Sequence, residues 1–223
     1  MASPVDPRLA GQVAGPVAPV PGQGTGSIDF YFDFSSPYGY FAAHRIDAIA
    51  KRCGRTVEWH PILLGLVFEV SGGRPLPSIP MKGDYARVDV LRTARFHGIA
   101  WQQPSKFPVS GQAACRAFYW LSAQDPLRAQ RLALALFHAY FADDRDISSP
   151  QVTVDVASEM GIPGPVLAAA LSDPAVKEVP RSATQQAISR GVFGSPYFIV
   201  DGEPFWGNDR LDQLERRLAE GAF

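Results

Sequence analysis

The chain has 223 residues, of which 46% are hydrophobic and 11% aromatic. Its 21 Lys and Arg residues and 22 Asp and Glu residues give a formal net charge of −1. These values are typical of an ordinary globular chain with a buried core. Because no excess of positive charge is present to release counterions from a polyphosphate, nucleic acid is excluded as an expected partner. No apolar stretch reaches the roughly 20 residues that a membrane span needs, so the sequence predicts no membrane span.

The two cysteines, Cys53 and Cys115, have no second Cys and no His close by at the spacing of a metal site. We therefore expect no bound metal and no disulfide chemistry, and we interpret each thiol as a small buried hydrophobe. Because reduced thiols persist in the cytoplasm, the sequence favours a cytoplasmic protein.

Residues 1–27 are rich in Pro, Gly and Ala and hold few large apolar side chains. A segment of this composition buries too little apolar surface to offset the loss of chain entropy. Its prolines would also interrupt the apolar middle of an export signal. We therefore predict a flexible tail over residues 1–27.

The first folded unit is predicted to be a strand, a helix and a second strand. Aromatic and β-branched residues over 28–34 favour a strand, and Pro37 suits the first turn of a helix because its missing N–H has no partner there. Ser36 is then the N-cap of a helix over residues 38–51. The run over 56–62 predicts the second strand, with a right-handed crossover between the two.

The middle of the chain, roughly residues 80 to 190, is predicted to be almost entirely helical. The expected helices are 85–97, 113–122, 127–142, 152–160, 166–171 and 176–190. Pro180 falls inside the last of these patterns, where proline kinks or breaks a helix, so that boundary stays open.

The C-terminal segment is predicted to form a β-hairpin followed by a helix. Residues 197–200 and 204–206 favour strands, and the pair Asp201-Gly202 between them is typical of a hairpin turn. Leucines recur on one face over 209–219, which predicts an amphipathic closing helix.

These elements together predict an α/β fold, in which a thioredoxin-like domain of the order βαβ…ββα is interrupted by an all-helical domain. The thioredoxin-like domain is expected to span residues 28–79 and 192–223. The helical insertion is expected to span residues 80–191.

Two motifs near the ends of the chain carry a resemblance to a known family. FYFDFSSPYGY lies at the end of the first strand, and GVFGSPYFIVDGEPFWGNDRL surrounds the predicted hairpin. Over residues 28–221 this combination resembles the 2-hydroxychromene-2-carboxylate isomerases, which are relatives of kappa-class glutathione transferases and of DsbA-like disulfide oxidoreductases. The resemblance implies glutathione as cofactor, an aromatic small-molecule substrate and a homodimer.

In that family the serine directly before the proline at the first helix start is catalytic, and it corresponds to Ser36, with Ser35 as the weaker candidate. The disulfide oxidoreductases carry C-x-x-C where this chain has SPYG, so thiol–disulfide exchange is excluded there. A hydroxyl at a helix N-terminus can instead donate a hydrogen bond to a thiolate that a ligand brings, and glutathione is the expected carrier. The alternative is that Ser36 only caps the helix.

The second motif holds the residues that the resemblance assigns to glutathione binding. Pro196 stands where thioredoxin-like folds carry a cis-proline, which would turn the backbone of Ser195 toward the cysteinyl part of glutathione. Asn208 and Asp209 stand where relatives contact the γ-glutamyl end, and an acidic side chain pairs well with its ammonium group. An ordinary trans proline and simple helix capping are the alternatives.

Three positions depart from the family pattern. Gly39 replaces a common serine, Gly73 stands where relatives often have an asparagine, and Ser195 replaces a more usual apolar residue. A backbone contact from residue 195 would survive its change, whereas the two glycines leave the choice of substrate open.

The resemblance implies a glutathione-dependent isomerase that converts 2-hydroxychromene-2-carboxylate to trans-o-hydroxybenzylidenepyruvate through transient addition of the thiolate. Two alternatives stay open: a kappa-like glutathione transferase of broad specificity, and a non-catalytic thioredoxin-fold binding protein. Consumption of glutathione in proportion to product would identify the transferase. Full activity of Ser36→Ala toward thiol-dependent substrates would argue that Ser36 only caps its helix.

Overall fold

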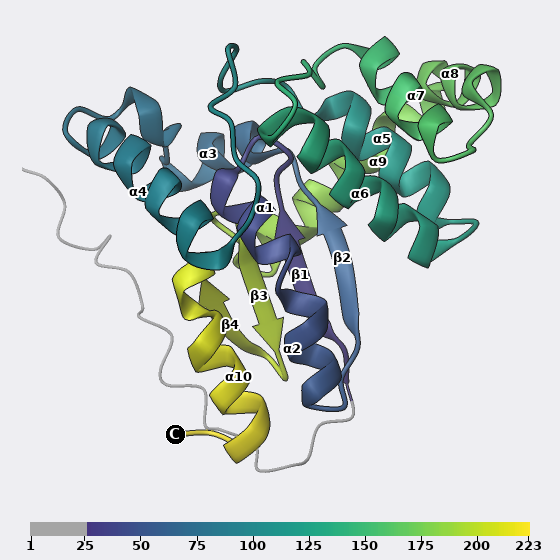
Figure 1. Cartoon of the computed structure of the whole chain (residues 1–223). Coiled ribbons are helices and arrows are strands. Elements are labelled where there is room, and N and C mark those ends of the chain that lie inside the picture. The colour runs from purple at the N-terminus through teal and green to yellow at the C-terminus, as the bar shows by residue number, and fades with distance from the viewer. Residues whose placement is uncertain (1–25) are drawn as a thin grey trace, which may run out of the picture.

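The computed structural model describes residues 26–223, whose elements are labelled in Figure 1. The tail predicted over residues 1–27 lies outside the described residues except for its last two. The strands are β1 (Ile28–Phe32), β2 (Val57–Pro61), β3 (Tyr197–Val200) and β4 (Glu203–Trp206). The helices are α1 (Pro37–Ala43), α2 (Ile46–Arg52), α3 (Leu64–Ser71), α4 (Lys82–His97), α5 (Gln112–Ser122), α6 (Pro126–Phe141), α7 (Pro150–Glu159), α8 (Gly164–Ser172), α9 (Pro174–Ser189) and α10 (Leu211–Glu220), with short 3₁₀ turns η2 (Leu76–Ser78) and η3 (Asn208–Arg210).

The strands form one four-stranded sheet in the order β2-β1-β3-β4. β1 runs parallel to β2, with Phe30 opposite Trp59, and antiparallel to β3, with Phe30 opposite Phe198. β4 pairs with β3 as the hairpin predicted around Asp201-Gly202. With α1 and α2 between β1 and β2, and α10 after β4, this order confirms the predicted α/β fold with its βαβ and ββα halves.

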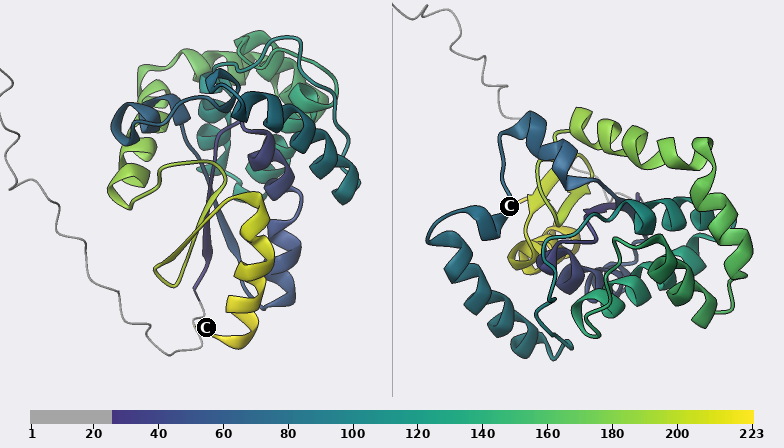
Figure 2. Two further views of the ribbon diagram at one scale, coloured as in Figure 1. Left: turned by 90° about the vertical axis from the view of Figure 1, so that its left-hand side faces the viewer. Right: turned by 90° about the horizontal axis from the view of Figure 1, so that it is seen from above.

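Helices cover both faces of the sheet, because successive side chains of a strand point to opposite sides. Phe30 of β1 belongs to the larger core, together with Ile46 of α2 and Leu214 of α10. The next residue, Tyr31, belongs to a second core with Val67 of α3 and with residues of α9. Figure 2 shows α2 and α10 side by side on one side of the sheet, and the two helices are in contact.

The first helix differs from the prediction of one continuous helix over 38–51. It is divided into α1 and α2 by a turn at His44 and Arg45. The Arg45 side chain donates to Asp212 at 2.9 Å and lies 3.4 Å from the carbonyl oxygen of Asn208, so contacts with the C-terminal segment hold the chain at this turn. Such tertiary contacts override helix propensity.

The helices predicted between residues 85 and 190 are all present, with ends that differ by at most three residues. α9 runs through Pro180, which resolves the boundary that the sequence left open. The helix α3 was not predicted. The domain boundaries at residues 80 and 191 stay a prediction, because α9 packs on both β2 and α5.

In Figure 1 the helix α4 lies at the left of the molecule and α5 to α9 lie at the right, and α1 contacts both α4 and α6. The inner side of α4 packs on α1. Within residues 26–223, no helix combines the length and the apolar character needed to cross a membrane.

Candidate active site

Ser36 caps the N-terminus of α1, as predicted. Its hydroxyl oxygen accepts a hydrogen bond from the Gly39 N–H at 3.1 Å, and its O–H donates to the carbonyl oxygen of Ser195, also at 3.1 Å. The residue is only 7% exposed. The Ser36 hydroxyl therefore connects the start of the first helix to the loop before β3, which lies 159 positions away in the sequence.

Ser35, the weaker candidate, has a different environment. Its hydroxyl oxygen accepts a hydrogen bond from the Val109 N–H at 3.0 Å. It is therefore bonded to the segment before α5, whereas Ser36 is bonded to Ser195.

The peptide bond between Ser195 and Pro196 is cis, which confirms the conformation predicted for Pro196. The Ser195 hydroxyl oxygen accepts from the Asp33 N–H at 2.9 Å, and the Pro196 carbonyl accepts from the Gly207 N–H at 3.0 Å. These bonds bring the end of β1, the start of α1 and the turn before α10 together. The five predicted site residues thus lie on adjoining segments: Ser36, Ser195, Pro196, Asn208 and Asp209.

Asn208 and Asp209 lie in η3, directly before α10, and they differ in exposure. Asn208 is buried, and the Arg45 guanidinium lies within 3.5 Å of its side-chain oxygen. The Asp209 side chain is 75% exposed and lies 3.5 Å from Arg210. Asp209 is therefore free to meet a ligand, whereas Asn208 is held inward, and a contact of either with glutathione stays a prediction.

Asp33 was not predicted as a site residue, although it lies three positions before Ser36. Its two carboxylate oxygens accept from the Ser35 N–H at 2.7 Å and from the Leu64 N–H at 2.8 Å. Burial raises the pKa of the Asp33 carboxyl to about 6, although these two backbone donors lower it. One signal was available in the sequence, an acidic residue within the apolar run from 28 to 34.

Tyr38 joins α1 to α4. Its hydroxyl donates to Asp89 at 2.7 Å, and Arg92 donates to the same carboxylate at 2.9 Å. Burial, followed by the hydrogen bond to Asp89, raises the pKa of Tyr38 well above its usual value, so the phenol stays protonated. The start of α1, next to Ser36, is therefore held against α4 by Tyr38.

An aromatic pair lies beside the cis-proline loop. Trp206 is 56% exposed, and its ring centroid is 4.9 Å from that of Phe193 in an edge-to-face contact. A Cβ atom on Gly194 would meet the Trp206 ring nitrogen at 2.4 Å, so the indole lies directly against the backbone next to Ser195. This surface suits an aromatic ligand.

Gly73, one of the departures from the family pattern, lies just after α3. A Cβ atom at this position would come within 2.4 Å of the Phe68 ring, so an asparagine does not fit without movement of that ring. Both cysteines are free, and burial raises the pKa of the Cys115 thiol well above its ordinary value. Among the described residues no three His, Cys, Asp or Glu side chains form a group that could hold a metal.

Comparison with known proteins identifies the family of this chain. The DSBA-like thioredoxin domain family matches residues 27–219. A 2-hydroxychromene-2-carboxylate isomerase of Sphingobium xenophagum is 32% identical over 199 residues, covering 88% of this chain and 100% of the relative. A kappa-class glutathione S-transferase of Caenorhabditis elegans, kappa 2, is 27% identical and covers 86% of this chain and 92% of the relative.

A solved structure of a 2-hydroxychromene-2-carboxylate isomerase has a TM-score of 0.77 to this chain at 29% identity, and the match covers 88% of this chain and 99% of that one. Both segments that meet at Ser36 lie within residues 27–219, which the family matches. The chain therefore belongs to the DSBA-like thioredoxin domain family, in the group that contains the 2-hydroxychromene-2-carboxylate isomerases and the kappa-class glutathione transferases.

Proposed function

We propose that this protein is a glutathione-dependent isomerase that converts 2-hydroxychromene-2-carboxylate and similar aromatic substrates to trans-o-hydroxybenzylidenepyruvate and similar products. The observation that supports this most directly is the Ser36 hydroxyl, which lies against the carbonyl before cis-Pro196 at a helix start that holds no cysteine. The isomerase names of the relatives support the reaction type.

The residues around Ser36 fit glutathione. The exposed Asp209 carboxylate offers a partner for an ammonium group, and the backbone at Ser195 and cis-Pro196 offers an edge to an extended peptide. Glutathione would supply the thiolate nucleophile that the SPYG segment lacks. Ser36 would hold this sulfur by a hydrogen bond, and the Phe193 and Trp206 rings would flank the aromatic substrate.

Hydroxyl donation is the main contribution that we assign to the first helix. α1 has seven residues and ends at Ala43, so the dipole of a longer helix is not available to the sulfur. The Ser36 O–H, which donates to the Ser195 carbonyl, must exchange this hydrogen bond for one to the sulfur when the ligand binds.

The proposed function is tested by a time course with 2-hydroxychromene-2-carboxylate and a small amount of glutathione. We expect product to exceed glutathione many times over, with the glutathione recovered unchanged, and no reaction when it is left out. Consumption of one glutathione for each product would identify a transferase. If the protein does not bind glutathione at millimolar concentration, the better hypothesis is a non-catalytic binding protein.

Replacing Asp209 by alanine is expected to weaken glutathione binding about threefold to fivefold, because one charge-assisted contact to the ligand ammonium is lost at an exposed position. Calorimetry measures this change. Glu220→Ala is the control, since Glu220 is an exposed acid at the far end of α10, the helix that follows Asp209. Equal affinity of Asp209→Ala and the wild type would remove Asp209 from the ligand site.

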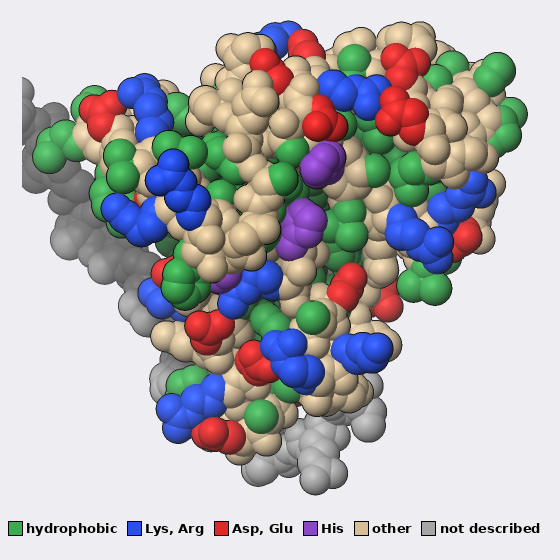
Figure 3. All heavy atoms as spheres, in the orientation of Figure 1, with side chains coloured by type: hydrophobic (Ala, Val, Ile, Leu, Met, Phe, Trp, Pro, Cys, Tyr) green, Lys and Arg blue, Asp and Glu red, His purple; other side chains and the backbone are tan. Residues whose placement is uncertain are grey.

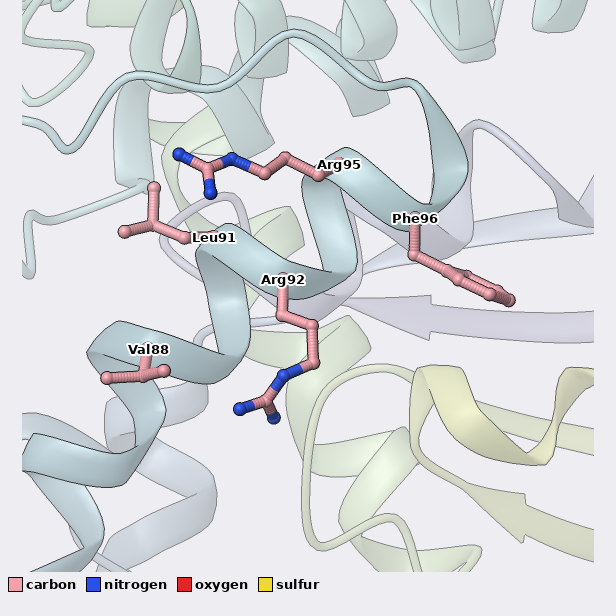
Figure 4. Close-up of a pocket in the computed structure, with 5 residues that line it drawn as sticks. All are labelled: Val88, Leu91, Arg92, Arg95 and Phe96. Carbon is pink, nitrogen blue, oxygen red and sulfur yellow. The ribbon is translucent and has the colours of Figure 1, made fainter.

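We also propose that the chain forms a homodimer, and that the outer face of α4 is the contact surface. A hollow on this face is lined by Val88, Leu91, Arg92, Arg95 and Phe96 (Figure 4). In Figure 3 the surface at the left, over α4, carries Lys and Arg side chains among hydrophobic ones. Exposed apolar side chains gathered on one helix face are typical of an interaction surface.

A second copy of α4 complements this face. Asp84, Val88, Leu91 and Arg95 follow one another at spacings of four, three and four residues, so they share one stripe of the helix. When two copies pack antiparallel about a two-fold axis, Asp84 of each faces Arg95 of the other, and Val88 faces Leu91. The stripe is thus self-complementary in charge and in apolar character.

The change Val88→Glu is expected to convert the dimer to a monomer, because it places two carboxylates opposite apolar side chains at the centre of the contact. Light scattering at matched concentrations measures the mass. Val166→Glu on α8 is a matched control, since Val166 is 54% exposed and Val88 is 56% exposed. A monomeric wild type would contradict the dimer, and a dimeric Val88→Glu variant would contradict the role of α4.

We place the enzyme in the cytoplasm, a proposal supported by the two free cysteines. Fractionation of the source cells with an antibody to the protein tests it. Recovery of the protein outside the cytoplasm would contradict it.

A further inference from the structure

The Ser195 hydroxyl has an unused proton. Its oxygen accepts a hydrogen bond from the Asp33 N–H at 2.9 Å, and this bond holds the oxygen in place. Among residues 26–223, the structure gives the Ser195 O–H no acceptor. A half-buried hydroxyl with a fixed oxygen and a free proton is ready to donate to a ligand.

Ser36 is in the opposite situation. Its oxygen accepts from the Gly39 N–H, and its proton is donated to the Ser195 carbonyl. Ser195 is therefore the better placed of the two hydroxyls to donate to a ligand.

Gly39 shows that the two hydroxyls lie next to each other. A Cβ atom built on Gly39 would be 3.0 Å from the Ser195 hydroxyl oxygen and 3.3 Å from the Ser36 hydroxyl oxygen. Both oxygens therefore border the same small space beside Gly39, which is too narrow for a Cβ atom unless its neighbours shift. A side chain at position 39 would compete with the Ser195 hydroxyl for it.

We propose that the Ser195 hydroxyl is a second hydrogen-bond donor to the sulfur that Ser36 binds, and that Gly39 makes room for the Ser195 hydroxyl. The inference rests on the proposed function, since the sulfur is that of glutathione. It gives one physical reason for two departures from the family pattern: a hydroxyl common at position 39 is absent, and a hydroxyl stands at position 195 instead.

The consequence concerns the acidity of the bound thiol. Each hydrogen bond to a charged sulfur favours the thiolate over the thiol and lowers the thiol pKa. Two donors that converge on one sulfur lower it further than Ser36 alone. The side chain of Ser195 thereby acquires a role separate from the backbone contact expected of residue 195.

The first experiment is a pH titration of the ultraviolet thiolate absorbance of bound glutathione in the wild type and in Ser195→Ala. The thiol pKa is expected to rise by about one unit in Ser195→Ala, a tenfold loss of thiolate at a pH below both values. Ser110→Ala is the matched control, because its hydroxyl also accepts from a backbone N–H, that of Gln112, but away from Gly39. The control is expected to titrate like the wild type.

The second experiment needs no glutathione. A double-mutant cycle combines Gly39→Ala with Ser195→Ala and follows the urea midpoint of unfolding. Gly39→Ala alone is expected to lower the midpoint because of the 3.0 Å contact, and to lower it less when Ser195 is already alanine. Additive midpoint shifts would mean that the Ser195 hydroxyl does not occupy the space beside Gly39, and the inference would be wrong.

The outcomes separate this inference from the proposed function. If the wild type binds glutathione as a thiolate and Ser195→Ala titrates at the same pH, only the role of the Ser195 hydroxyl is lost. If the wild type binds no glutathione, the proposed function and this inference are both overturned. A raised thiol pKa in Ser195→Ala together with a non-additive cycle supports the inference.

Discussion

The change Ser36→Ala is expected to lower kcat/KM of the isomerisation by about 100-fold to 1,000-fold, the usual effect of removing one hydrogen-bond donor from a developing or bound anion. The reason is that alanine cannot donate to the sulfur from the position at which Ser36 now meets the Ser195 carbonyl. The same change removes an N-cap and is expected to cost about 1 kcal/mol of stability. Steady-state kinetics and urea unfolding measure the two effects separately.

Asp125→Ala is a matched control for the loss of the cap. Asp125 caps α6, is followed by Pro126, and accepts from the Arg128 N–H at 2.9 Å, just as Ser36 is followed by a proline and accepts from the residue three positions on. Asp125→Ala is expected to lose similar stability and to keep its activity. If both variants lose activity to the same extent, Ser36 only stabilises its helix and the proposed chemistry is wrong.

Asp33 is expected to make the protein less stable as the pH rises from about 4 to about 7. Its pKa is about 6 in the folded protein and 3.8 as an unperturbed side chain, because burial disfavours the carboxylate. The folded state therefore binds the proton more tightly, so the contribution is fully present below pH 3.8 and is lost as the pH passes 6. The shift corresponds to about 3 kcal/mol.

The measurement is the difference in unfolding free energy between the wild type and Asp33→Asn, taken from urea titrations at a series of pH values. The asparagine amide has one acceptor oxygen for the two N–H groups of Ser35 and Leu64. This lowers the unfolding free energy of the variant by an amount that does not depend on pH. The wild type is expected to lose about 3 kcal/mol relative to the variant across this window. A constant difference from pH 4 to pH 7.5 would contradict a buried, titrating Asp33.

Asp29→Asn provides a control of opposite sign. Although burial raises the pKa of Asp29, hydrogen bonds from His60 and Arg190 outweigh it and lower the pKa to about 2. The stability due to Asp29 is therefore present above its unfolded value of 3.8 and is lost as the pH falls toward 2. The two variants should thus differ from the wild type in different pH windows and in opposite directions.

Local sequence signals were sufficient for most of the fold. The hairpin at Asp201-Gly202 and the cap at Ser36 depend on residues next to one another, and both are present. The cis-proline at 196, which was expected from the resemblance to thioredoxin-like folds, is present as well. The hairpin and the cap can be predicted from the sequence because turn and cap chemistry act over two to four residues.

The elements that the sequence did not predict depend on distant residues. α3 has no side-chain cap of its own: the Leu63 N–H donates to Thr184 and the Leu64 N–H to Asp33, which lie 121 and 31 positions away. The turn between α1 and α2 likewise depends on Arg45 and its partner Asp212, 167 positions away. No pattern within one segment carries that information.

The candidate site divides in the same way. Ser36 and Pro196 are visible as motifs, whereas the burial of Asp33 and the space beside Gly39 exist only where segments from both ends of the chain meet. Sequence reasoning treated Ser195 as a backbone contact, because the position of a hydroxyl proton follows from the folded arrangement alone.

The pairing of the central strand β1 is completed late in synthesis. It pairs on one side with β2, soon after it in the chain, and on the other with β3, where Phe30 meets Phe198. Until the ribosome has released β3, the unpaired edge of an apolar strand is open to other chains, which is the situation that aggregation exploits. Fragments that lack the C-terminal hairpin, made from a truncated message or by a protease, should therefore be insoluble. A growing chain should depend on chaperones until its last strands emerge from the ribosome.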